Sequence, residues 1–316
     1  RHLHQDTPSE ARRGSRTGRL ERRSGDPMIN GDTGLVGLLG NPVRHSLSPA
    51  MHNAALQALQ LNWSYLALPC ASENLNEVLQ GLRAVNCRGL NVTIPHKQDV
   101  ADLCQELSPL AKRLGAVNTL IPLDSGGWHG TNTDVEGFLT PLGEASSWQN
   151  CHGVIIGCGG SARAIAAGLQ HLGLASITVI GRRPDALDEF IRDLHHNDAP
   201  LTPCLHSSPV LASLIEQADL VVNTTPVGMA QHGDTQAFPL GEAVWSHLQG
   251  SAVLYDLVYT PRPTAWLSWG QSRGHRCIDG LEMLVQQGAA SLRLWSDRTD
   301  VSVETMRLAA EAALKP

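Results

Sequence analysis

A glycine-rich turn carries the clearest chemistry in this sequence. Gly157, Gly159 and Ala162 match the spacing G-x-G-x-x-G/A, which binds the pyrophosphate of dinucleotides in other proteins. The first glycine permits a tight turn, the second lets a phosphate approach the backbone, and the small third residue keeps the next helix close to the strand. The free N–H groups and the positive end of that helix would then face the phosphates. The same spacing also fits an ordinary turn between a strand and a helix.

The segments around this turn favour the nucleotide site. An apolar run at residues 154–156 precedes the turn, a helical pattern at 164–172 follows it, and a second apolar run comes at 177–180. This order of strand, turn, helix and strand is the opening unit of a dinucleotide-binding sheet. Arg182 and Arg183 follow the second strand, where an acid would bind the ribose of NAD. They favour a 2′-phosphate and hence NADP, unless they are solvated surface residues.

Two serines beside a predicted helix start offer a second binding site. Ser48 and Pro49 are typical of an N-cap and a first helical residue, and the helix is predicted over about 50–59. Capping alone would account for Ser48, whereas Ser46 has no such structural role. Two hydroxyls beside a helix N-terminus would suit a carboxylate.

Strands and helices alternate along the rest of the chain. The patterns predict strands at 34–40, 63–68, 89–94, 116–121, near Trp128, and at 219–223 and 252–259. They predict helices at 75–85, 135–142 and 265–273, and two more before the C-terminus. They also predict a helical region that follows Lys97, extends to residue 114 and is broken near Pro109. This alternation indicates an α/β fold.

The composition excludes several classes of protein. The chain has 316 residues, enough for two domains, and its 42% hydrophobic and 17% charged residues are typical of a soluble globular protein. The net charge of −6 gives no argument for a nucleic acid partner, and no apolar run reaches the roughly 20 residues of a membrane span. The seven cysteines are scattered and indicate reduced thiols in a cytoplasmic protein. No His or Cys spacing indicates a metal site.

Residues 1–27 differ from everything after them. They are Arg-rich and polar without apolar periodicity, so we expect them to be disordered. The apolar region of a signal peptide is missing, and several acidic residues argue against a transit peptide. We expect an upstream extension, with Met28 as a candidate natural start.

A series of motifs resembles the shikimate dehydrogenase family from about Gly34 to the C-terminus. The matching stretches are residues 45–49, 91–97, 115–119, 132–134, 157–160, 223–229 and 279–287. Cys158 stands where the family usually has alanine, and Gly181, Arg182 and Arg183 stand where it has N-R-T. The arginine of that motif is therefore kept.

The resemblance implies a reversible, NADPH-dependent reduction of 3-dehydroshikimate to shikimate, on the route to chorismate and aromatic amino acids. It implies an α/β fold with two domains and an active-site cleft between them. The substrate-binding domain would comprise residues 28–133 and 280–316, and an inserted Rossmann-like NADP-binding domain would comprise 134–279. The expected partners are NADP(H) and a small-molecule substrate, without nucleic acid or membrane. A homodimer is left open.

The resemblance also assigns roles to residues. Lys97 and Asp134 would form the catalytic pair, although Asp134 could also cap a helix and either residue could transfer the proton. Residues that would bind the substrate carboxylate and ring hydroxyls are Ser46, Ser48, Asn91, Thr93, Asn118, Tyr259 and Gln287. Residues that would contact the cofactor are Gly157, Cys158, Gly159, Gly160, Ser161, Ala162, Arg182, Arg183, Asn223, Thr224, Thr225, Pro226, Gly228, Met229, Leu257 and Gly280.

Two alternatives belong to the same family. A quinate/shikimate dehydrogenase would accept an extra ring hydroxyl and often NAD, and Arg182 and Arg183 count against NAD. A non-catalytic relative would sense pathway metabolites. Lys97 and Asp134 are both retained and no DNA-binding segment is added, which counts against the sensor.

Overall fold

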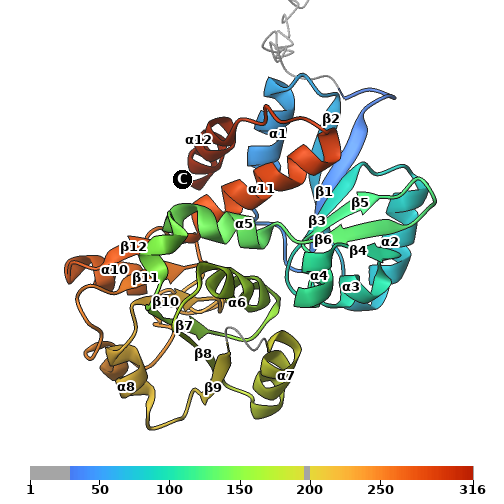
Figure 1. Cartoon of the computed structure of the whole chain (residues 1–316). Helices are drawn as coiled ribbons and strands as arrows, with labels where there is room; N and C mark the ends of the chain where they lie inside the picture. The colour runs from blue at the N-terminus through green and yellow to red at the C-terminus, as the bar shows by residue number, and fades with distance from the viewer. Residues whose placement is uncertain (1–28, 196–199, 316) are drawn as a thin grey trace, which may run out of the picture.

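A computed structural model describes residues 29–195 and 200–315. Figure 1 shows two α/β lobes, each built on its own sheet. The last helices of the chain return to the lobe that the N-terminal segments form. The expectations for residues 1–27 and for Met28 lie outside the described residues. The predicted α/β fold with two domains is confirmed.

The first lobe holds a mixed sheet with the strand order β2-β1-β3-β5-β6-β4. Its strands are β1 (Gly34–Gly40), β2 (Trp63–Pro69), β3 (Gly89–Val92), β4 (Glu106–Leu107), β5 (Thr119–Pro122) and β6 (Trp128–Thr131). β1 lies parallel to β2 and β3, whereas β5 runs antiparallel to β3 and β6. The helices between them are α1 (Ser48–Ala58), α2 (Leu75–Ala84), α3 (Asp99–Leu103) and α4 (Pro109–Leu114), with the short 3₁₀ turn η1 (Ser72–Asn74) before α2.

Both ends of the chain build this lobe. The C-terminal helices α11 (Gly280–Ser296) and α12 (Val303–Leu314) pack beside α1, as Figure 1 shows. Met51 of α1, Leu292 of α11 and Met306 of α12 are fully buried in one hydrophobic cluster. Burying these apolar side chains stabilises the association of segments that are far apart in sequence.

The second lobe is a parallel sheet with the order β12-β11-β10-β7-β8-β9. With β7 counted as strand 1 and the sheet read from its β9 edge, this is the order 3-2-1-4-5-6 of a dinucleotide-binding fold, in which ligands bind where the strand order reverses. The strands are β7 (His152–Ile156), β8 (Ser176–Gly181), β9 (Leu201–Leu205), β10 (Leu220–Asn223), β11 (Val253–Asp256) and β12 (Arg276–Ile278). The helices are α6 (Gly160–Leu172), α7 (Pro184–Leu194), α8 (Leu211–Glu216), α9 (Glu242–Trp245) and α10 (Ala265–Ser272).

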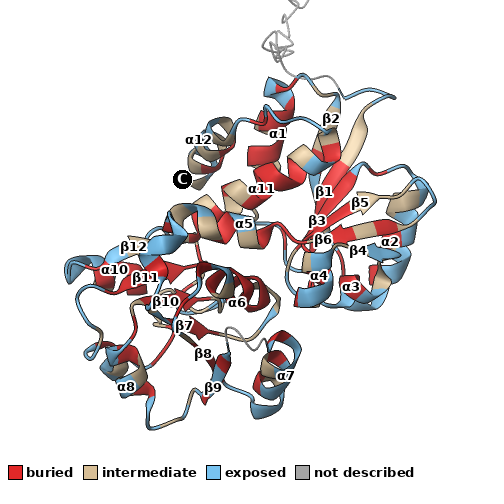
Figure 2. Ribbon diagram, viewed as in Figure 1, coloured by how far each residue is buried: buried red, intermediate tan, exposed pale blue. Residues whose placement is uncertain are grey.

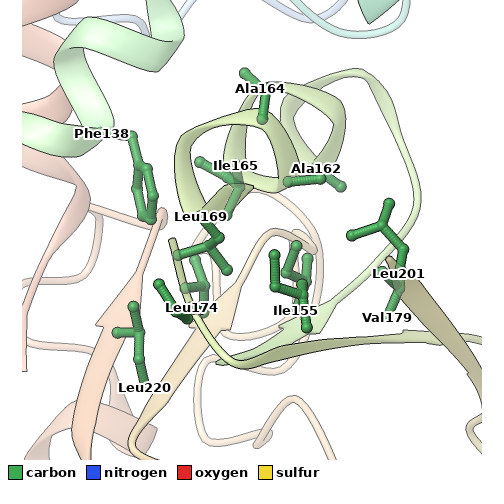
Figure 3. Close-up of a cluster of buried hydrophobic side chains, with 14 of the residues drawn as sticks. Phe138, Ile155, Ala162, Ala164, Ile165, Leu169, Leu174, Val179, Leu201 and Leu220 are labelled. Atoms are coloured by element: carbon green, nitrogen blue, oxygen red, sulfur yellow. The ribbon is translucent and has the colours of Figure 1, made fainter. Parts of the chain in front are cut away.

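Helix α6 is fixed to this sheet by close apolar packing. Figure 3 shows Ala162, Ile165 and Leu169 of α6 against Ile155 of β7 and Val179 of β8. Ala162 is 1% exposed, so a larger side chain there would push the helix away from the strands. The packing holds the start of α6 at the end of β7, which is where the glycine-rich turn lies.

Helix α5 (Asp134–Leu139) joins the lobes and lies along α11 in Figure 1. A side chain on Gly137 of α5 would come within 2.7 Å of the Met283 carbonyl oxygen, so the two helices approach very closely. Most residues of α11 are buried, and Figure 2 colours much of this helix accordingly. Two 3₁₀ turns, η2 (Thr140–Leu142) and η3 (Ala145–Trp148), then lead into β7.

The structure differs from the predicted elements at several edges. β4, β9 and β12 were not predicted, because each is a short strand at or near a sheet edge and β9 contains Pro203, a residue tolerated mainly in edge strands. The strand predicted at 116–121 begins only at Thr119. The reason is that the Val117 N–H donates to the Lys97 carbonyl at 2.7 Å instead of to a strand. Within the described residues, no helix is long and apolar enough to cross a membrane.

Candidate active site

A cavity of about 220 Å³ lies between the lobes. Both predicted catalytic residues and every predicted substrate-binding residue line it: Lys97, Asp134, Ser46, Ser48, Asn91, Thr93, Asn118, Tyr259 and Gln287. The second lobe contributes a further group of predicted cofactor residues: Ser161, Thr224, Thr225, Pro226, Met229 and Leu257, together with Gly280 at the start of α11. Segments from 46 to 287 therefore converge on one space.

Lys97 and Asp134 form a buried ion pair at the wall of this cavity. Lys97 Nζ lies 2.6 Å from Asp134 Oδ2, and the two residues are 8% and 4% exposed. Asn118 donates from Nδ2 to the other carboxylate oxygen at 2.9 Å. Removing charges from water is costly unless they are paired and hydrogen-bonded, and both conditions hold here. The positive end of α5 adds to the stabilisation of the carboxylate.

The sequence also allowed Asp134 to cap a helix, and the structure does not support that role. It is the first residue of α5, and Thr133 occupies the capping position without a side-chain cap bond. The Asp134 backbone N–H instead donates to Asn132 Oδ1 at 3.0 Å. Its carboxylate is left for Lys97 and Asn118.

A network of buried amides and hydroxyls supports the cavity floor. Asn91 Nδ2 lies 2.9 Å from Ser291 Oγ, and Ser291 Oγ lies 2.8 Å from Thr119 Oγ1. Asn118 Oδ1 accepts from the Thr133 N–H at 2.8 Å, and its Nδ2 also lies 3.3 Å from Gln287 Oε1. These bonds hold the amide of Asn118 in one orientation.

Ser291 does not line the cavity itself, but it is a buried partner of the cavity-lining Asn91 that the sequence analysis missed. It is fully buried, and its hydroxyl lies near Asn91, Thr119 and Thr133 at 2.8–3.2 Å. It follows Gln287 by four positions on α11, a spacing that puts both side chains on one helix face. That spacing is the signal by which it could have been found.

Ser46, Ser48 and Tyr259 all line the cavity, but the structural roles of the two serines are reversed from the prediction. Ser48 is the first residue of α1, and Leu47 in the capping position makes no side-chain bond. Ser46 Oγ instead accepts from the Ser48 N–H at 3.2 Å, so Ser46 satisfies the helix start. Burial raises the pKa of Tyr259, while hydrogen bonds from Ser46 and the Leu47 backbone oppose that rise. The prediction that Ser48 caps the helix was wrong, because the helix begins at Ser48 itself, one residue earlier than the capping pattern indicates.

The glycine-rich turn has the geometry expected of a phosphate site. Gly157 has φ of 111°, and a side chain there would lie 2.4 Å from Thr224 Oγ1, so only glycine fits. Gly159 is exposed, and nothing lies within 4 Å of where its side chain would start. Helix α6 begins at Gly160, and its first N–H groups face this open space.

Several predicted cofactor residues lie outside the cavity, along neighbouring strand ends. They are Gly157, Cys158, Gly159, Gly160 and Ala162 after β7, Arg182 and Arg183 after β8, and Asn223 and Gly228 at and after β10. Both arginines are exposed. Burial raises the pKa of the Cys158 thiol, and the charges of Arg183, Arg163 and Arg182 oppose that rise.

Asn223 is held rigidly beside the turn. It is fully buried, its Nδ2 donates to Asp256 Oδ1 at 2.9 Å, and its Oδ1 accepts from the Thr225 N–H at 3.0 Å.

Gly280 permits a close approach between α11 and the segment after β11, because a side chain there would lie 2.0 Å from the Leu257 carbonyl oxygen. Thr225, Leu257 and Gly280 all line the cavity.

The fold and the site together define a class of protein. A parallel sheet of dinucleotide-binding order, an open glycine turn with no room for a side chain at its first position, and a buried Lys–Asp pair at the interlobe cavity indicate a nicotinamide-dependent oxidoreductase.

Comparisons with known proteins narrow this class. Residues 38–120 match the family model of the shikimate dehydrogenase substrate binding domain, and residues 280–311 match that of the shikimate 5′-dehydrogenase C-terminal domain. Shikimate dehydrogenase (NADP⁺) from Prochlorococcus marinus strain MIT 9515 is 44% identical over 88% of this chain and 97% of its own. The enzyme of the same name from Synechocystis is 47% identical over 90% and 97%. A crystal structure of shikimate 5-dehydrogenase from Thermus thermophilus, in complex with NADP(H) and shikimate, has a TM-score of 0.76. It is 34% identical, with 89% of this chain and 100% of that chain covered.

The chain belongs to the shikimate dehydrogenase family. The family expected from the motifs is therefore confirmed.

Proposed function

We propose that this chain catalyses the reversible reduction of 3-dehydroshikimate to shikimate with NADPH, a step in the synthesis of chorismate and aromatic amino acids. The observation that carries the proposal is the position of the Lys97–Asp134 pair. Lys97 Nζ lies 2.6 Å from Asp134 Oδ2 and 3.3 Å from Ser161 Oγ, in the first turn of the predicted cofactor helix. A proton donor thus adjoins the place where a hydride donor would bind. The names of the curated relatives support the same activity.

NADPH, when bound, supplies the hydride, and the residues of the chain supply the proton. Reduction of a ketone develops negative charge on its oxygen, which a nearby ammonium stabilises. The Lys97 ammonium can also donate the proton that completes the alcohol. Asp134 holds the ammonium at 2.6 Å, and Asn118 in turn holds Asp134 at 2.9 Å.

The polar groups around the cavity suit a ring with one carboxylate and several hydroxyls. Ser46, Ser48 and Tyr259 offer three hydroxyls for the carboxylate. Asn91, Thr93, Asn118 and Gln287 offer amide and hydroxyl groups for the ring. The Oδ1 of Asn91 accepts from the Tyr65 hydroxyl at 2.9 Å, and a carbonyl oxygen has a second lone pair that a ring hydroxyl could use.

We propose that Arg182 and Arg183 select NADP over NAD. Both follow β8, where the ribose of a bound dinucleotide would lie. Both are exposed and would bind a phosphate without losing a buried partner. A guanidinium binds a phosphate by two parallel hydrogen bonds, which adds geometric selectivity to charge. The cofactor in the names of the curated relatives supports NADP.

A substrate panel tests this function. Oxidation of NADPH would be followed with 3-dehydroshikimate and with 3-dehydroquinate, and each reaction would be repeated with NADH. We expect fast oxidation of NADPH with 3-dehydroshikimate and much slower turnover in the other three combinations. Equal turnover of both substrates would favour the quinate/shikimate alternative. No turnover, with shikimate still bound in calorimetry, would favour the metabolite sensor.

Three further expectations stand as proposals. The domain limits of 28–133 with 280–316 and of 134–279 are supported by the two separate sheets, whose strands lie within 34–131 and 152–278. A cytoplasmic location is supported by the seven cysteines, which are all free. A homodimer would be tested by sedimentation of the purified chain.

A further inference from the structure

Arg163 is a buried cation at the junction of the lobes, and the proposed chemistry does not use it. It is 3% exposed and lies in the first turn of α6. Within its own lobe it forms an ion pair with Asp193 of α7, at 2.8 Å from Nη2 to Oδ2. Its guanidinium also lies 5.7 Å from the centre of the Phe190 ring.

Its remaining contacts cross to the first lobe. Nη1 donates to the carbonyl of Leu114, the last residue of α4, at 3.1 Å. A cation is stabilised there by the negative end of the helix. With its amide oxygen turned toward the guanidinium, Gln98 accepts from Nε at 3.2 Å and from Nη2 at 3.3 Å. Gly115 follows α4, and a side chain there would lie 3.3 Å from Nη1. The first lobe therefore leaves room for the guanidinium and offers it two carbonyl oxygens, one from the Leu114 backbone and one from the Gln98 side chain.

These crossing contacts are next to the predicted catalytic lysine on one side and the predicted cofactor turn on the other. Gln98 follows Lys97 directly in the chain. A side chain on Gly160 would lie 3.1 Å from Lys97 Cβ, and Ser161 Oγ lies 3.3 Å from Lys97 Nζ. Residues 160–163 thus contact both the Lys97 loop and the end of α4.

We propose that Arg163 is a positioning residue that sets the distance between Lys97 and the cofactor helix. This inference rests on the proposed function, because it concerns the alignment of the hydride donor with the proton donor. Each of the two groups belongs to a different lobe, so their separation depends on bonds between lobes. Arg163 makes such bonds from the helix whose start faces the cofactor.

The test compares three variants of the full chain. Arg163→Met removes all the bonds and leaves no buried charge, Gln98→Ala removes one crossing partner, and Asp193→Asn removes only the ion pair inside the second lobe. Small misplacements of reacting groups can lower rates by about 100-fold. We expect Arg163→Met to lower kcat by roughly 10- to 100-fold, with Kd for NADP⁺ and shikimate changed less than about 3-fold. Gln98→Ala should give a smaller fall in kcat, and Asp193→Asn should keep the wild-type kcat.

An isotope effect separates positioning from simple loss of folded protein. With NADPH deuterated at the transferred position, the isotope effect on kcat should rise in Arg163→Met, because hydride transfer becomes slower than product release. Loss of folded molecules alone would leave the isotope effect at the wild-type value, and that result would overturn the proposal. A fall in kcat for Asp193→Asn equal to that of Arg163→Met would also overturn it.

A wild-type chain that does not reduce 3-dehydroshikimate would contradict the proposed function. The role of Arg163 in holding the lobes together could then still be tested by a measurement that does not depend on activity. Amide hydrogen exchange at residues 97–98 and 111–117 of the NADP⁺-bound chain should quicken in Arg163→Met but not in Asp193→Asn. Unchanged exchange in Arg163→Met would show that Arg163 does not hold the lobes together, whichever substrate the chain takes.

Discussion

Lys97 and Asp134 are 37 positions apart in the chain, yet Nζ and Oδ2 lie 2.6 Å from each other at the wall of the interlobe cavity. Asn118 Nδ2 donates to the second carboxylate oxygen at 2.9 Å, so the acid is fixed on both sides. An ammonium carries three N–H groups. One is directed at Asp134 and one at Ser161, and among the described residues the third remains for a substrate oxygen. This arrangement can hold a proton donor in place throughout the reaction.

The first prediction concerns the cofactor. A hydrogen bond to a charged group contributes roughly 1.5–3 kcal/mol, so the loss of one arginine should weaken NADP⁺ binding about 10- to 150-fold. Arg182→Ala and Arg183→Ala would be measured by calorimetry with NADP⁺ and NAD⁺, and NAD⁺ affinity should change little. Arg192→Ala, an exposed arginine of α7 in the same lobe, is the control. Intact NADP⁺ affinity in both variants would mean that the 2′-phosphate is bound elsewhere.

The second prediction separates capping from substrate binding. Ser46→Ala should lower the free energy of unfolding by about 1 kcal/mol, since Ser46 Oγ accepts from the Ser48 N–H at the start of α1. It should also raise the KM for 3-dehydroshikimate, because the same hydroxyl faces the cavity beside Tyr259. Urea unfolding and steady-state kinetics would measure both effects.

Ser302 provides a matched control for this substitution. Its Oγ accepts from the Thr305 N–H at 3.1 Å and caps the start of α12. Ser302→Ala should lose about the same stability, roughly 1 kcal/mol, with a normal KM. If Ser46→Ala shows a normal KM as well, Ser46 has a structural role alone.

The third prediction concerns acid stability. His52 is fully buried, and burial lowers its pKa from 6.5 to about 4, against hydrogen bonds to the Ser48 and Gly288 backbone. A histidine with a lowered folded pKa contributes stability that is present above pH 6.5 and is lost as the pH falls toward 4. The stability advantage of wild type over His52→Gln should therefore shrink by about 2 kcal/mol between neutral pH and the middle of that window.

The comparison must be made between variants, because Asp256 acts in the opposite direction. Burial raises its pKa to about 6, against hydrogen bonds from Thr264, Val258 and Asn223. Its contribution is present below pH 3.8 and is lost as the pH rises through 6. The pH curve of the wild type alone would mix the two groups. A stability difference between wild type and His52→Gln that is constant with pH would show that His52 keeps an ordinary pKa.

Local patterns in the sequence predict much of this structure. Gly157, Gly159 and Ala162 indicate the turn and its strand and helix, because their small size and backbone freedom are local requirements. The predicted catalytic and substrate-binding residues were found by motif, and all of them line the cavity. Their individual roles stay predictions until they are measured.

The missed features depend on contacts between distant segments. Ser46 and Ser48 exchanged structural roles because the start of α1 is decided by its packing as well as by its capping residues. The buried position of Arg163 depends on α4 of the other lobe, which no pattern near residue 163 encodes. The role of Ser291 also depends on a distant segment, because its partner Asn91 lies 200 positions away in the chain.

The fourth prediction concerns the charge of residue 97. We expect Lys97→Arg to have a much lower kcat than the wild type. A guanidinium stays protonated, and its planar shape differs from that of an ammonium. Asp134→Asn should lower kcat as well, because a neutral amide would replace the carboxylate that holds the Lys97 ammonium in place. Near wild-type kcat in Lys97→Arg would mean that residue 97 acts by its charge alone.

The kinetics of Lys97→Ala test the central claim most directly. Positioned acid–base groups contribute about 10²- to 10⁴-fold to rates, so kcat for the reduction of 3-dehydroshikimate should fall by that order. Shikimate and NADP⁺ should still bind in calorimetry, because the carboxylate site and the glycine turn are untouched. A Lys97→Ala chain with near wild-type kcat and only a raised KM would contradict the account, and would assign proton transfer to Asp134 or to water.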